Sequence, residues 1–66
     1  MTDIGTFIYK KRKEHGWSRE ILAALAKCST NTIFQLERHG NVTLYTLRSV
    51  ADVLGYELKL VKKHDD

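Results

Sequence analysis

The chain has 66 residues, of which 42% are hydrophobic and 29% are charged, and it contains no proline. This balance suits one small folded domain better than a disordered chain, and a single cysteine, Cys28, excludes an internal disulfide. The net charge of +3 is too small to indicate a polyanionic partner by itself. With no apolar run near the roughly 20 residues of a membrane span and no signal peptide, we expect a cytoplasmic protein.

The first predicted helix is an apolar stripe that begins with Ile4, Phe7 and Ile8. Helical spacing places Arg12 and His15 further along the same face. Gly16 then interrupts the pattern. We therefore expect this helix to end near Gly16 and to carry one charged residue, Arg12, on its buried side.

Two short helices follow, each preceded by a serine that is a good N-cap residue. Ser18 precedes a helix of about two turns, and Ser29 precedes the next one. The apolar positions of the second helix are Ile21, Leu22, Leu25 and Ala26, and those of the third are Ile33 and Leu36. The tight break at Lys27 and Cys28 predicts a helix-turn-helix unit, which can present the third helix to the major groove.

A fourth helix is predicted between a stop signal at His39, Gly40 and Asn41 and a second stop at Gly55. Thr43 is its expected N-cap residue. Its apolar residues are Leu44, Leu47, Val50, Ala51 and Leu54.

After Gly55 the apolar period changes from helical to alternating, which predicts one β-strand. Tyr56, Leu58 and Leu60 point to one side of it. Nothing earlier in the chain resembles a partner strand, so we expect antiparallel pairing with a second copy in a two-fold dimer. The alternative is a tail that is packed on its own domain or partly disordered. The expected organisation is a DNA-binding domain over 1–55, a dimerisation strand over 56–62 and a flexible tail over 63–66.

Small and apolar residues hold the positions typical of one helix-turn-helix family, namely Leu22, Ala23, Ala26, Ile33 and Leu36. The sequence Gln35-Leu36-Glu37-Arg38 lies at the end of the third helix. Over residues 12–55 the chain thereby resembles the Cro/C1-type (XRE) family. The resemblance implies an all-α, lambda-repressor-like domain in which the buried Arg12 pairs with Glu37. Lys27 departs from the family, which usually has glycine at this turn because the turn tends to need a positive φ.

The resemblance makes the third helix a recognition helix. Its base-reading candidates are Thr30, Asn31 and Gln35, because amide side chains can bond adenine and threonine can meet the thymine methyl. The phosphate-contact candidates are Arg19, Ser29, Thr32, Arg38 and Asn41. The charge distribution supports this interpretation, since Tyr9–Arg38 carries seven bases and three acids. A solvated helix face would also explain the run from Lys10 to Lys13.

Ile21, Leu25 and Phe34 occupy positions where the family is usually polar. The favoured interpretation of Ile21 and Leu25 is that they are core residues of a slightly rotated helix, and the other is that they form a partner surface. Phe34 either belongs to that surface or touches a thymine methyl or sugar.

The expected function is a homodimeric repressor that binds an inverted repeat in double-stranded DNA. The segment at the end of the fourth helix and in the predicted strand resembles HipB-like antitoxin regulators; it reads Leu54-Gly55-Tyr56-Glu57-Leu58-Lys59-Leu60. This resemblance implies a possible toxin partner. Phage repressors and restriction-modification controllers share the same helices. The alternative function is a protein-interaction module on this fold. No nucleophile–base pair or metal motif is present, so neither catalysis nor a cofactor is expected.

Overall fold

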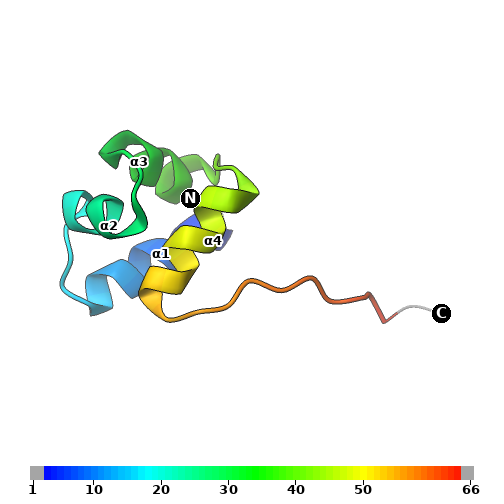
Figure 1. Cartoon of the computed structure of the whole chain (residues 1–66). Helices are drawn as coiled ribbons and strands as arrows, with labels where there is room; N and C mark the ends of the chain where they lie inside the picture. Colours follow the sequence, from blue (N-terminus) through cyan, green and yellow to red (C-terminus); the bar gives the residue numbers. More distant parts are fainter. Residues whose placement is uncertain (1–2, 65–66) are drawn as a thin grey trace.

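Four helices follow one another in the computed structural model, which describes residues 3–64. They are α1 (Asp3–Glu14), α2 (Arg19–Ala26), α3 (Thr30–His39) and α4 (Leu44–Leu54). α3 packs on both α1 and α2, and α4 packs on α2 and α1 (Figure 1). The expected all-α class and the four predicted helices are confirmed.

The last three helices begin at a serine or threonine whose side-chain oxygen accepts a hydrogen bond from a backbone N–H three residues later. The N-cap residues are Ser18, Ser29 and Thr43, and the donors are the N–H groups of Ile21, Thr32 and Thr46. Each contact satisfies one of the N–H groups that a helix start leaves without a partner. All three predicted starts are confirmed.

The same three helices end at a residue in the left-handed conformation. Gly40 and Gly55 end α3 and α4, and Lys27 ends α2 with a φ of 61° and a ψ of 46°. Glycine adopts this conformation without strain, whereas a residue with a Cβ atom does so at a cost. Lys27 is the only non-glycine residue with positive φ among residues 3–64.

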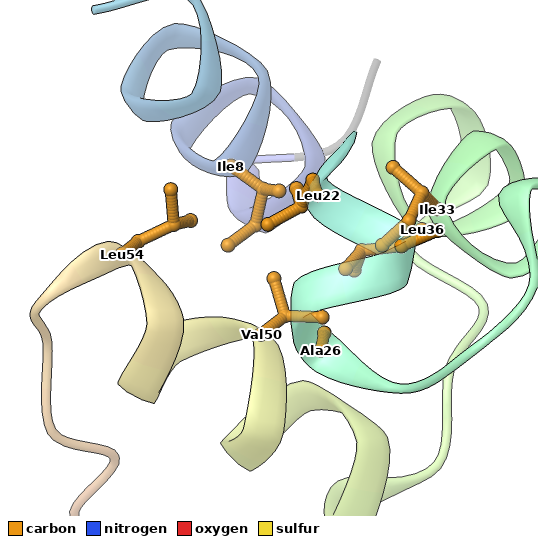
Figure 2. Close-up of a cluster of buried hydrophobic side chains, with 8 residues drawn as sticks. Ile8, Leu22, Ala26, Ile33, Leu36, Val50 and Leu54 are labelled. Carbon is orange, nitrogen blue, oxygen red and sulfur yellow. The ribbon is translucent and has the colours of Figure 1, made fainter. Parts of the chain in front are cut away.

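The core lies where the four helices meet, and its large side chains point toward one another (Figure 2). Ala23 on α2 is buried as well, and its small side chain lets α2 and α3 approach closely. The fully buried apolar side chains come one or two from each helix: Ile8, Leu22, Ile33, Leu36 and Val50.

Five residues expected on the apolar faces of the helices are exposed, namely Phe7, His15, Ile21, Leu25 and Leu44. His15 lies just after the end of α1, so it leaves the helical stripe and stacks on Trp17 with the ring centres 4.3 Å apart. Ile21 and Leu25 are 45% and 48% exposed, so their interpretation as core residues was wrong. The buried face of α2 consists of Leu22, Ala23 and Ala26, which turns Ile21 and Leu25 toward the outside.

The segment after α4 is not a strand within the single chain. Residues 56–64 are neither helix nor strand, and they extend away from the helices (Figure 1). A strand needs a hydrogen-bonding partner, and no other part of the described chain is extended beside this segment. The single chain therefore does not support the predicted strand, and pairing with a second copy stays a prediction. The alternative of a tail packed on its own domain holds for the start of the tail.

The start of the tail is held against α1 by one aromatic contact. The Tyr56 N–H donates to Ala51 O over 2.8 Å, and the Tyr56 ring meets the Phe7 ring edge to face with centres 5.0 Å apart. The Lys11 ammonium lies 5.7 Å and 5.6 Å from the centres of these two rings. Its interactions with Tyr56 and then with Glu14 raise the pKa of Lys11. Tyr56 therefore anchors the tail rather than presenting its ring freely to a partner.

Residues 1–2, at the start of the predicted DNA-binding domain, and residues 65–66, in the predicted flexible tail, lie outside the described residues. Within the described range, no helix is long and apolar enough to cross a membrane.

Because Lys27 ends α2 in the left-handed conformation, we expect Lys27→Gly to stabilise the domain. We expect the free energy of unfolding to rise by about 1 kcal/mol, because glycine removes the steric cost of positive φ. Urea denaturation followed by circular dichroism measures the change.

Gly16→Ala is the matched control. Gly16 has a φ of +72° and open space around the position of an added Cβ atom, so only the backbone cost applies. This variant should be destabilised by a similar amount. A destabilised Lys27→Gly variant would contradict this account of the α2 end.

Candidate nucleic-acid interface

One side of α3 is buried and the other carries polar residues. Ile33 and Leu36 hold the buried side on the core. Asn31 is exposed, and Thr30 and Gln35 are half-buried. At 100° per residue, Asn31 and Gln35 lie on the side opposite the core, whereas Thr30 lies in line with Ile33 and Glu37, at the edge of the buried side.

The buried side of α3 also contains an ion pair to α1. Arg12 Nε donates to Glu37 Oε2 over 2.7 Å, and Arg12 Nη2 donates to Glu37 Oε1 over 3.1 Å. Arg12 Nη1 donates to the Trp17 carbonyl over 2.8 Å. The pair expected from the sequence is thus formed, with both side chains almost fully buried. It joins α1, the α1–α2 turn and α3 at one point, which restricts the orientation of α3.

A second arginine binds the same carboxylate. Arg19 Nε donates to Glu37 Oε1 over 3.1 Å, and the Arg19 side chain is 41% exposed. The sequence predicted Arg19 only as a phosphate contact. No spacing rule connects α2 to the end of α3, so this bond could be found only from the packing.

Phe34 lies beside two guanidinium groups on the outer side of α3. Its ring centre is 5.4 Å from Arg19 Cζ and 5.8 Å from Arg38 Cζ, both within the range of a cation–π interaction. Phe34 is half-buried, so it is neither a core residue nor a fully exposed one. Its apolar character, unusual for the position, is thus explained in part by contacts inside the chain.

The other phosphate-contact candidates differ in how free their side chains are. The hydroxyls of Ser29 and Thr32 lie 2.8 Å apart and bond one another at the start of α3. Arg38 and Asn41 are exposed at the end of α3 and in the loop that follows. Arg38 and Asn41 can therefore reach an external anion with less rearrangement than Ser29 and Thr32.

An open groove of about 870 Å³ runs between α1, the α1–α2 turn and the start of α3. It adjoins the base-reading candidates, since Thr30 and Asn31 form part of its wall. Cations and aromatic rings form much of the rest: Tyr9, Arg12, Lys13, Trp17, Arg19 and Phe34. This mixture of charge and apolar surface suits a ligand with both anionic and apolar parts.

Comparison with known proteins supports this interpretation of the α2–α3 unit. The family model described as Helix-turn-helix matches residues 8–61, which includes all of α2, α3 and α4. The chain belongs to the Cro/C1-type helix-turn-helix family. It is therefore a DNA-binding regulator, and double-stranded DNA is its ligand. A search of curated proteins found no match.

The remaining chemistry of this helix-turn-helix domain is limited. Burial raises the pKa of the Cys28 thiol, which keeps the thiol protonated and poorly reactive at neutral pH. Within residues 3–64 no group of three His, Cys, Asp or Glu side chains could hold a metal ion. The described residues include no buried side-chain polar atom that lacks a hydrogen bond.

Because two arginines bind the Glu37 carboxylate, we expect Glu37→Gln to destabilise the domain strongly. The substitution leaves the Arg12 guanidinium buried without a negative partner, and such a loss costs about 3–5 kcal/mol. We expect the free energy of unfolding to fall by this amount, measured by urea denaturation.

Arg12→Met combined with Glu37→Leu is the informative comparison. The double variant removes both buried charges at once, so it should be more stable than Glu37→Gln alone. Equal stability of Glu37→Gln and the wild-type chain would show that the buried pair does not hold α3.

Proposed function

We propose that this chain is a homodimeric transcriptional repressor that binds an inverted repeat and reads each half-site through the major groove with α3. The observation that carries the proposal is the division of α3 into two sides. Ile33, Leu36 and Glu37 are buried, while the opposite side presents polar side chains at the first turns. A helix held rigidly on one side can place short side chains against base edges.

The residue types on the outer side favour half-sites that contain A·T pairs. Asn31 and Gln35 can each bond adenine N6 and N7 with one amide, and Thr30 supplies a hydroxyl and a methyl group. Phosphate contacts in this proposal come from Arg19, Arg38 and Asn41, with Ser29 and Thr32 at the N-terminus of α3. Arg19 adds a charged contact at the start of α2, which makes the affinity depend more steeply on salt.

Replacing Asn31 or Gln35 with alanine should remove sequence preference. We expect each variant to lose about 1–3 kcal/mol of discrimination between the selected duplex and a scrambled one, because one bidentate base contact disappears. Selection from a random duplex library identifies the preferred sequence, and fluorescence anisotropy measures both affinities.

Lys10→Ala is the control. Lys10 is an exposed cation of α1, so its removal should leave the ratio of the two affinities unchanged. An unaltered ratio in both alanine variants of α3 would exclude α3 as the base-reading element.

The tail supports the dimeric part of the proposal. Leu60 and Val61 are 98% and 77% exposed, and Tyr56 fixes where the tail leaves the domain. An extended segment with unpaired backbone groups and exposed apolar side chains is stabilised by pairing with a copy of itself. We therefore assign the dimer interface to residues 56–62, with Leu58 and Leu60 buried against the second copy.

A groove beside the tail supplies more of the interface. It has a volume of about 330 Å³ and lies between α4 and residues 57–60. Leu44, Leu58 and Leu60 supply its apolar wall, and the charged residues Arg48, Asp52, Glu57 and Lys59 surround them. Both signs of charge are present on one surface, so two copies related by a two-fold axis can meet there without net repulsion.

Leu58→Lys with Leu60→Lys should convert the dimer to a monomer, because two charges would then have to be buried in the interface. Analytical ultracentrifugation measures the association. Affinity for the inverted repeat should fall, while affinity for a single half-site should stay the same. Lys10→Ala, a change of an exposed residue of α1 outside the tail and its groove, is the control. A double variant that stays dimeric would refute the assignment of residues 56–62.

The antitoxin-type role is a further part of the proposal, supported by the resemblance of residues 54–60 to HipB-like regulators. It includes a toxin protein as a second partner. The alternative is a protein-interaction module, and the exposed pair Ile21 and Leu25 on α2 favours it. The two functions are separable, because the α3 alanine variants should lose specific DNA binding and retain any protein contact made through Ile21 and Leu25.

A further inference from the structure

Phe34 sits in the middle of the outer side of α3 and has no role in the helix-turn-helix function described so far. We propose that its ring positions the guanidinium groups of Arg19 and Arg38, and that the three side chains form one contact site for the sugar–phosphate backbone of DNA. Phe34 is thus a positioning residue. The inference rests on the proposed DNA-binding function and adds a specific structural device to it.

Phe34 brings together arginines from two helices. Phe34 and Arg38 are four residues apart, so they lie one above the other on α3. Arg19 reaches the same ring from the start of α2. Because Glu37 also binds Arg19 Nε, the Arg19 side chain is held at two points, a carboxylate and an aromatic face. Little side-chain freedom then remains to be lost on binding, which favours affinity.

The residues around Phe34 carry more positive than negative charge. Glu37 is the negative partner of both Arg12 and Arg19, and Arg38 lies close by at the same ring. Two guanidinium groups therefore bind one carboxylate, and that of Arg38 lies at the Phe34 ring beside them, which leaves a local surplus of two positive charges. The guanidinium groups of Arg19 and Arg38 are at least partly exposed. An anion placed between them relieves the repulsion that the free protein carries.

The anion that suits this site is part of a DNA strand. The ring of Phe34 forms part of the groove wall next to Thr30 and Asn31, so a strand read by α3 must pass close to it. Further along the groove, the Tyr9 ring has the exposed Lys13 near it, with Nζ 5.9 Å from the ring centre. A linear ligand with alternating phosphates and sugars matches this second combination of a cation and a ring. Contact with a base edge alone would leave these cations without a phosphate to bind.

The test compares Phe34→Leu with Phe34→Tyr in the full chain, on the selected duplex and at several salt concentrations. Leucine keeps an apolar side chain but removes the aromatic face, while tyrosine keeps the ring. We expect Phe34→Leu to weaken binding roughly threefold to thirtyfold and Phe34→Tyr to restore most of the affinity. In Phe34→Leu, the slope of log K against log salt should become shallower by about one phosphate contact. Base preference should not change.

Two results would overturn the inference. A Phe34→Leu variant with wild-type affinity and wild-type salt slope would show that the ring positions nothing. A lost preference for thymine at one position, with the slope unchanged, would make Phe34 a base contact instead. Circular dichroism and thermal melting establish that each variant is folded.

Failure of the proposed function has a different signature. A wild-type chain that selects no duplex sequence contradicts sequence-specific regulation. The salt slopes on a random duplex then still decide the role of Phe34, because a backbone contact requires no particular sequence. Identical slopes for the wild-type chain and Phe34→Leu on that duplex would overturn the inference there too.

Discussion

The carboxylate of Glu37 determines how the DNA-binding helix is held. It is 2% exposed, so burial is tolerable only because Arg12 and Arg19 both donate to it. These two arginines come from α1 and from the start of α2. One buried group thereby connects three helices, and it acts at the last turns of α3, on the side away from Asn31 and Gln35.

This constraint separates the tasks of α3. Apolar packing by Ile33 and Leu36 places the helix on the core, but apolar contacts alone permit small rotations and shifts. Directional bonds to Glu37 exclude many of these alternatives, so the outer side can present Asn31 and Gln35 in a fixed direction. The same carboxylate also aligns Arg19 with Phe34, which connects base reading to contacts with the DNA backbone.

Much of the fold was predictable because its signals are local. The N-cap residues Ser18, Ser29 and Thr43 act on backbone groups three residues away, and apolar periodicity identifies the core. A buried partner for Arg12 was also predictable, since a charge on an apolar stripe needs one, and the family resemblance identified it as Glu37. The left-handed Lys27 followed from the resemblance to proteins that have glycine there.

Other features depend on packing between segments and leave no local signal. Ile21 and Leu25 follow a helical apolar pattern, yet the face that α2 buries is set by the close approach of Ala23. The contacts of Phe34 with Arg19 and Arg38 require the α2–α3 angle. The alternating residues after Gly55 predicted a strand, but pairing depends on a second molecule, so a single chain cannot form it.

The central claim is that α3 enters the major groove through the side opposite Glu37. Nuclear magnetic resonance of the nitrogen-15-labelled chain, titrated with its selected duplex, tests this most directly. The account predicts the largest changes at the side-chain amides of Asn31 and Gln35 and at the Arg19 Nε–H group. Changes concentrated at Ile21 and Leu25, with the α3 amides unaffected, would contradict it.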